Sequence, residues 1–201
     1  WRKEKLEDKL RVPNDQRLTV IWNYLKRRNA SPRRIQRTCE LTDFHPFFIE
    51  RIGELVKIEN KLVKIRKNIP KKILLKAKHN GFSDSHISHL TGKKEETIRN
   101  QRKRMNITSS FLMVDTCAGE FEAKTPYFYS TYADQKSEYK IEKSIVILGS
   151  GPIRIGQGIE FDYSTVHGVQ AVRKAGYEAV VVNNNPETVS TDFDASDRLY
   201  F

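Results

Sequence analysis

The chain has 201 residues, of which 38% are hydrophobic and 30% are charged, and its formal net charge at pH 7 is +11. This length suits one domain of ordinary size or two small ones. No apolar run approaches the roughly 20 residues that span a bilayer, and no basic–apolar–small signal sequence opens the chain. These features argue against membrane and secreted proteins, and we expect a cytoplasmic location.

The residues that could bind a metal or act as nucleophiles are few. Cys39 and Cys117 lie far apart and form no CxxC pair, which argues against a disulfide framework and a zinc site. His86 and His89 could share a helix face, but no third ligand stands at a suitable spacing. Ser164 is not part of a GxSxG nucleophile elbow. We therefore predict no metal site and no catalytic residue in this chain.

The positive charge is concentrated in the first half. Residues 1–110 hold 28 Lys and Arg against 12 Asp and Glu, whereas residues 111–201 hold 8 against 13. Such a break usually marks a domain boundary, and a basic block raises the possibility of nucleic-acid binding. We also expect the chain to be an internal piece of a longer polypeptide, because it opens at Trp1 without Met and ends on the apolar pair Tyr200–Phe201.

Residues 1–106 are expected to be almost wholly helical. After candidate caps at Asn14 and Asp15, apolar residues recur at helical spacing at Leu18, Ile21, Trp22 and Leu25. A second helix is expected to start near Ser31–Pro32, with serine at the cap and proline in the first turn.

The longest helix is predicted from about His45 to Arg66. Its apolar stripe would comprise Phe48, Ile52, Leu55, Ile58, Leu62 and Ile65. Two or three shorter helices are expected, over about 70–79, 83–90 (capped by Ser83) and 93–105. The pattern indicates an all-α helical bundle over residues 1–110.

Residues 111–142 lose the helical period. They carry many aromatic residues, including the run Tyr127-Phe-Tyr. Ordinary linkers seldom carry so many aromatics. We predict an extended connector that packs over a neighbouring domain.

From residue 143 the pattern becomes that of an α/β domain. Ser144-Ile-Val-Ile-Leu-Gly suits a buried parallel strand, Val166–Ala175 suits a helix that stops at Gly176, and Ala179-Val-Val-Val-Asn suits a second strand. Strand, glycine loop, helix and strand form the opening of a doubly wound sheet. Residues 143–201 are therefore expected to form an incomplete Rossmann-like domain.

The glycine loop that follows the first strand runs Gly149-Ser-Gly-Pro-Ile-Arg-Ile-Gly-Gln-Gly. A dinucleotide site needs a third glycine and an acidic residue after the second strand, and Arg154 and Asn183 occupy these positions. NAD binding is therefore disfavoured. The loop can instead be a tight turn without a ligand, or it can line a passage or approach an anion with its backbone.

One stretch resembles a helix-turn-helix. A helix capped by Ser83, a turn at Gly92 and a basic second helix would suit the major groove of DNA. The basic residues are, however, scattered over every helix, as is usual for solvated faces. A DNA-binding regulator with an α/β domain stays open as the alternative function.

Two longer motifs carry a specific resemblance. Residues 149–163 and 182–201 strongly resemble the entry to the second half of the carbamoyl phosphate synthetase large subunit. The segments Val-Asp-Thr-Cys-Ala-Gly-Glu-Phe at 114–121 and Tyr-Ser-Thr-Tyr at 129–132 are also similar to that family. Residues 1–110 follow its oligomerisation domain more loosely, and residues 143–201 would begin its pre-ATP-grasp domain.

The resemblance implies a large ATP-dependent ligase. The full subunit would make carbamoyl phosphate from bicarbonate, ammonia and two ATP, for pyrimidine and arginine biosynthesis. A glutaminase small subunit would supply the ammonia, and the helical domain would mediate self-association. ATP, Mg²⁺ or Mn²⁺, and K⁺ would bind elsewhere in the subunit, so the isolated chain would be inactive. Neither nucleic acid nor a membrane is expected as a partner.

The resemblance also assigns roles to individual positions. Arg154, Gly158, Glu160 and Glu187 match the passage through which carbamate would move. Gly149, Gly151 and Gly156 belong to the loop beside it. Such a passage must keep bulk water from an unstable anion while offering balanced charges.

Overall fold

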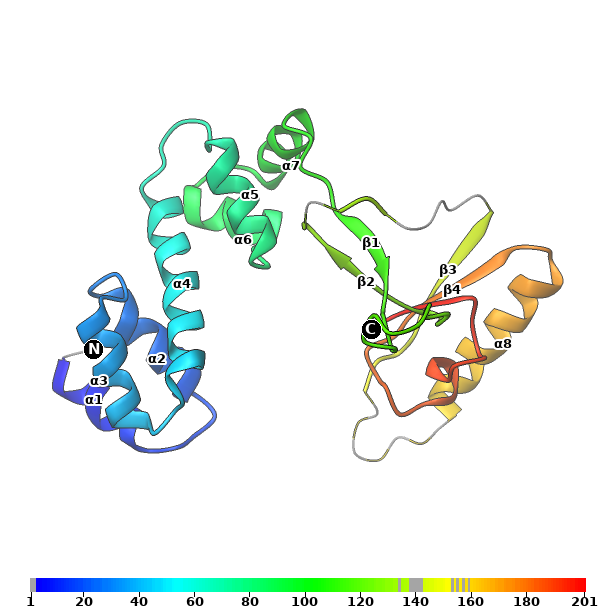
Figure 1. Cartoon of the computed structure of the whole chain (residues 1–201), viewed down its shortest axis with the longest axis horizontal. Helices are drawn as coiled ribbons and strands as arrows, with labels where there is room; N and C mark the ends of the chain where they lie inside the picture. Colours follow the sequence, from blue (N-terminus) through cyan, green and yellow to red (C-terminus); the bar gives the residue numbers. More distant parts are fainter. Residues whose placement is uncertain are drawn as a thin grey trace. The chain divides into compact units, whose positions relative to one another are not determined.

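A computed structural model describes residues 3–133, 135–137, 143–152, 154, 156, 158 and 160–201 (Figure 1). The chain divides into two compact units, Trp1–Thr108 and Ser109–Phe201. The first unit is helical, and the second combines a mixed sheet with helix. Among the described residues, no helix combines the length and apolar character needed to cross a membrane.

Helices build the first unit. They are α1 (Lys3–Arg11), α2 (Arg17–Lys26), α3 (Pro32–Thr42), α4 (Pro46–Val63), α5 (Lys71–His79), α6 (Asp84–Thr91) and α7 (Glu95–Arg104). Helix α4 is the longest, and Figure 1 shows α1, α2 and α3 gathered around one end of it, with α5 and α6 near the other. The helices expected after residue 14 are present, and the predicted boundaries shift by one or two residues except at the end of α4, whereas α1 was not predicted as a separate helix.

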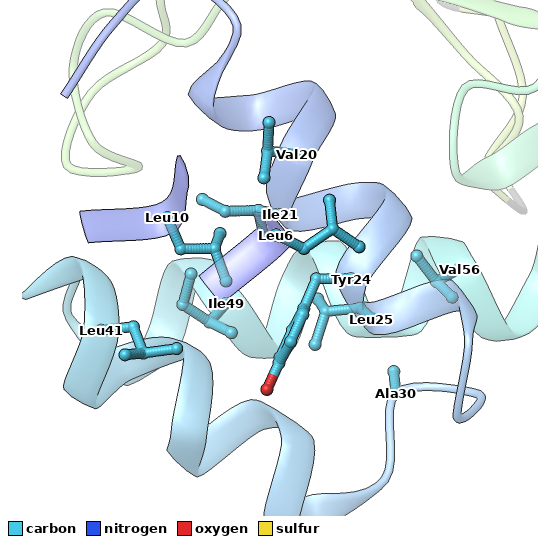
Figure 2. Packing of buried hydrophobic residues seen from close by; sticks show 10 residues of the cluster. All are labelled: Leu6, Leu10, Val20, Ile21, Tyr24, Leu25, Ala30, Leu41, Ile49 and Val56. Atoms are coloured by element: carbon cyan, nitrogen blue, oxygen red, sulfur yellow. The ribbon is translucent and has the colours of Figure 1, made fainter. Parts of the chain in front are cut away.

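A single apolar cluster lies between α1, α2, α3 and α4 (Figure 2). It comprises Leu6, Leu10, Val20, Ile21, Tyr24, Leu25, Ala30, Leu41, Ile49 and Val56. Burying each large aliphatic side chain stabilises the fold by about 1.5–3 kcal/mol. On helix α2, Val20 faces the cluster and is 5% exposed, whereas Leu18 is 63% exposed. Leu18, although it shares the helical spacing of Ile21 and Leu25, therefore lies outside the core.

The buried face of α4 is also rotated from the predicted stripe. Ile49, Gly53 and Val56 face the cluster, while Phe48 is 59% exposed. Gly53 lies there because a Cβ would stand only 3.2 Å from the Cβ of Ala30. Ile58 and Leu62 are buried as predicted, since the far end of α4 packs on other helices.

The turns of the second half of the unit follow local rules. Ser83 caps α6, because its Oγ accepts a hydrogen bond from the backbone N–H of His86 at 2.9 Å. Gly92 ends that helix in the left-handed region, at φ 68°. The Ser83 cap and the Gly92 turn are confirmed.

The second unit is built on a five-stranded sheet. Its strands are β1 (Ser110–Met113), β2 (Tyr127–Thr131), β3 (Ser144–Leu148), β4 (Glu178–Val182) and β5 (Arg198–Tyr200), in the order β1-β2-β5-β4-β3. Strands β1 and β2 pair antiparallel, whereas the pairs β2–β5, β5–β4 and β4–β3 are parallel. The segment 111–142, expected as an extended connector, thus supplies one strand and most of another.

Helix α8 (Glu160–Lys174) connects β3 to β4 and covers one face of the sheet (Figure 1). Val169 packs on Ala179, Val181 and Leu199, which are almost fully buried. Alternate residues of a strand face the same side, so these positions form a continuous apolar surface under the helix. The helix begins six residues earlier than the predicted Val166, which places Glu160 and Asp162 in its first turn.

Candidate functional site

The loops that follow β3 and β4 meet at one edge of the sheet. The two strands are parallel, so their carboxyl ends lie side by side. The backbone N–H of Gly149 extends this pairing by donating to the carbonyl of Val182 at 2.9 Å. The glycine loop and the segment 183–191 therefore form one local site.

Asn183 is the hydrogen-bonding centre of this edge. Its side-chain carbonyl accepts the backbone N–H of Gly151 at 3.1 Å and that of Asn185 at 3.3 Å. Its amide nitrogen donates to the Oγ of Ser190 at 3.1 Å. Asn183 is 3% exposed, so these bonds satisfy a buried polar group. Asn183, which stands where a dinucleotide site needs an acidic residue, thus joins the two loops.

Asp162 fixes the same segment from the first turn of α8. Its Oδ2 accepts hydrogen bonds from the backbone N–H of Ser190 at 2.6 Å and from the Oγ of Thr188 at 2.8 Å. The carboxylate is 4% exposed. Its role was missed from the sequence. The available signal was an acidic residue in a helix first turn together with a segment rich in Ser and Thr.

Three glycines of the loop have little room for a side chain. A Cβ on Gly149 would lie 2.5 Å from the Asn183 amide, and one on Gly151 would lie 2.8 Å from the Oδ1 of Asn184. Gly151 also has φ +76°, a region that favours glycine. A Cβ on Gly158 would overlap the carboxylate of Glu160. A side chain at Gly149 would displace the buried Asn183, whereas the exposed carboxylate of Glu160 beside Gly158 can turn away.

The charged residues assigned to the passage are open to solvent in this structure. Arg154, Glu160 and Glu187 are exposed, and Gly158 is half-buried. Glu160 opens α8, while the backbone N–H of Glu187 donates to the Oδ1 of Asn185 at 3.1 Å. Gly156, also exposed, has φ +87°.

Comparison with known proteins assigns the chain to a family. Residues 1–106 match the family described as carbamoyl-phosphate synthetase large chain, oligomerisation domain. The chain belongs to the carbamoyl-phosphate synthetase large-chain family. Residues 141–201 match a second domain of that enzyme, described as the carbamoyl phosphate synthase preATP-grasp domain.

Two curated relatives extend the comparison over nearly the whole chain. The carbamoyl phosphate synthase arginine-specific large chain of Bacillus subtilis is 48% identical over 193 residues, which cover 94% of this chain. The carbamoyl phosphate synthase large chain of Methanosarcina mazei is 48% identical over 202 residues, covering 100% of this chain. Each alignment spans only 18% of the relative. These matches favour the synthetase over the helix-turn-helix regulator.

Within the part of the chain that the structure describes, no group of three or more His, Cys, Asp or Glu side chains could hold a metal ion. His86 instead stacks on Phe82, with ring centroids 5.0 Å apart.

Proposed function

We propose that the chain is part of a large subunit that makes carbamoyl phosphate from bicarbonate, ammonia released from glutamine, and two ATP. In this proposal the edge formed by the glycine loop and segment 183–191 is part of the wall of a carbamate passage. One observation carries it: Gly158 and Glu160, two positions assigned to the passage, lie against each other, since a Cβ on Gly158 would meet the Glu160 carboxylate.

The domain assignment belongs to the same proposal. Residues 1–110 would form a helical oligomerisation domain, and residues 143–201 would form the first part of a Rossmann-like pre-ATP-grasp domain. The two family matches support these roles. Strands β1 and β2 would attach the intervening segment 111–142 to the sheet of the second domain.

The chemistry of carbamate fits charged residues at the rim of a passage. Carbamate is an anion that decomposes in water, so its route must exclude bulk solvent without binding it tightly. Arg154 would attract the anion, and Glu160 and Glu187 would balance the positive charge and prevent trapping. Other parts of the longer subunit would cover these exposed residues.

The cofactors and partners are proposed for the longer subunit. ATP, Mg²⁺ or Mn²⁺, and K⁺ would be held by regions beyond the 18% of the relatives that this chain spans. A glutaminase small subunit would deliver ammonia, and the helical unit would contribute to self-association. The role of this chain would then be assembly and transport of the intermediate.

The test uses the complete large subunit with its glutaminase partner and the substitution Gly158→Leu. A blocked passage should lower glutamine-dependent carbamoyl phosphate formation at least about tenfold. In the proposed subunit one half phosphorylates bicarbonate and the other half phosphorylates carbamate. The bicarbonate-dependent ATPase and the synthesis of ATP from carbamoyl phosphate and ADP should therefore persist, because each needs only one half and not the passage between them. Equal loss of all three activities would contradict a transport role.

Gly168→Ala is the matched control for this experiment. Gly168 lies within α8, and a Cβ there would meet Ile147 at an ordinary 3.8 Å. All three activities should be retained in this variant. Carbamoyl phosphate formation that is normal in Gly158→Leu would refute the proposed passage.

A further inference from the structure

A cavity lined by arginines lies within the helical unit, far in sequence from the glycine loop. Its volume is about 720 Å³, within the range of small-molecule sites. Residues from α1, the end of α2, the following turn and α3 line it: Glu7, Tyr24, Arg28, Ser31, Arg33, Arg34, Gln36, Arg37 and Glu40. Four arginines thus face two carboxylates.

The two carboxylates are already engaged. Arg37 bonds to Glu40 at 3.1 Å and to Glu7 at 3.3 Å, and the Tyr24 hydroxyl donates to Glu7 at 2.7 Å. Among the residues that the structure describes, Arg28 and Arg33 have no ion-pair partner. The lining therefore keeps an excess of positive charge.

Arg34 is the least satisfied of these residues. Its guanidinium carbon lies 4.0 Å from the centroid of the Tyr24 ring, which fixes the group against the aromatic face. Its Nη1 is buried and has no hydrogen-bond partner among the described residues. A buried polar group without a partner is costly, and a charged one more so. This positive charge without a partner next to the cavity favours an anion nearby.

The start of α3 adds to the positive potential. Ser31 is its N-cap residue, Pro32 occupies the first turn, and that turn contains no acidic residue. The first turn instead carries Arg33 and Arg34, although the positive end of the helix dipole disfavours cations there. A local rule broken in this way is typical of a functional site.

We propose that this cavity binds the phosphate group of a small phosphorylated molecule. Guanidinium groups match phosphate oxygens in geometry and can donate two hydrogen bonds to the same phosphate. Arg28, Arg33 and Arg34, which all line the cavity, would contact the phosphate. The volume leaves room for an organic portion beside the phosphate.

The proposal is tested by titrating the isotopically labelled 201-residue chain with inorganic phosphate, ribose 5-phosphate or ribose at constant ionic strength. Amide signals of residues 31–37 should shift with both phosphates and not with ribose. Absence of shifts up to about 20 mM of either phosphate, or equal shifts with ribose, would overturn the proposal. Stronger binding of ribose 5-phosphate than of inorganic phosphate would support an organic ligand, and equal or weaker binding would overturn that part.

Two variants separate binding from folding. Arg34→Gln should weaken phosphate binding about tenfold, the cost of one charge-assisted hydrogen bond. Arg33 is exposed, so Arg33→Gln should leave the fold intact and still weaken binding. Arg51→Gln, which removes an exposed pair with Glu54, is the control and should bind normally. Unchanged binding in Arg33→Gln, or an equal loss in Arg51→Gln, would contradict a specific site.

Discussion

The side-chain carbonyl of Asn183 accepts the backbone N–H of Gly151 at 3.1 Å, and so joins the loop after β3 to the end of β4. The same side chain reaches Ser190 through its amide nitrogen. Two loops that enter the site from different strands are therefore held by one buried residue. The position of the glycine loop depends on this amide.

Replacing this amide should loosen the loop. Asn183→Ala leaves the N–H groups of Gly151 and Asn185 without their acceptor, so we expect the second unit to lose about 2–3 kcal/mol of stability. Urea unfolding followed by circular dichroism measures this loss, and hydrogen exchange at Gly151 should accelerate. Asn184→Ala, at the exposed neighbouring position, should cost less than about 0.5 kcal/mol. Equal effects of the two substitutions would contradict the anchoring role.

Gly149 should not tolerate even a methyl group. A Cβ there would lie 2.5 Å from the Asn183 amide, so Gly149→Ala must displace a buried, fully bonded side chain. Overpacking of this kind costs about 1–3 kcal/mol. Gly168→Ala, in the middle of α8, should instead be neutral or stabilising, because alanine favours helix over glycine by about 1 kcal/mol. The comparison uses the urea midpoints of the two variants, and a stable Gly149→Ala protein would refute the close approach.

Asp84 is expected to be a main electrostatic support of the α5–α7 region. Its carboxylate bonds to Lys78 at 3.0 Å and to Arg102 at 3.0 Å, and both Asp84 and Lys78 are buried. Breaking a buried ion pair costs about 3–5 kcal/mol. Asp84→Asn should therefore accelerate hydrogen exchange in α5, α6 and α7. Glu95→Gln, which breaks the exposed pair with Arg99, should change stability by less than about 0.5 kcal/mol.

The same carboxylate predicts a pH dependence. Burial opposes its ionisation, but hydrogen bonds from Arg102 and Lys78 outweigh burial, so the pKa of Asp84 lies below its usual value. The folded state then binds its proton more weakly than the unfolded state, and the stabilisation is present at neutral pH. It should be lost as the pH falls below about 4. The stability difference between wild type and Asp84→Asn should shrink over that interval, and a constant difference would contradict this account.

The pKa of Tyr200 depends on the charge of Arg198, the buried arginine of β5. Burial raises the pKa of Tyr200, while the charge of Arg198 lowers it and that of Glu178 raises it. Arg198→Met should thus raise the Tyr200 pKa further, whereas Glu178→Gln should lower it. ¹³C NMR of labelled tyrosine over an alkaline titration distinguishes the two directions. Shifts of the same sign in both variants would contradict the arrangement in which Arg198 bonds to Glu178 at 2.6 Å.

The helices were predictable because their signals are local. Ser83 and Gly92 indicate helix ends within a few residues, and the apolar spacing of α2 indicates a helix. The buried face of α4 could not be predicted, because apolar residues cover more than one of its faces. Only the helices that pack on α4 determine that Ile49 is buried and Phe48 is exposed. Short sequence patterns predicted the type of secondary structure, whereas the side of each helix that faces the core is decided by tertiary contacts.

Strands β1 and β2 escaped prediction for a related reason. Tyr127 pairs with Leu199, which lies 72 positions later, and such pairing leaves no trace in the local sequence. The Asn183 network depends likewise on the approach of two loops. The residues of the glycine loop were identified from the sequence, but the residues that hold them were not.

The strand order has a consequence for how the protein matures. β5 lies between β2 and β4, with Leu199 fully buried, although it comprises residues 198–200. During synthesis, the helical unit can fold from local contacts. The β1–β2 hairpin and the β3–α8–β4 element cannot yet pair with each other at this stage. Only when β5 leaves the ribosome can the two pieces join through it. The interval before then is when exposed strand edges are most vulnerable to misassembly with other nascent chains.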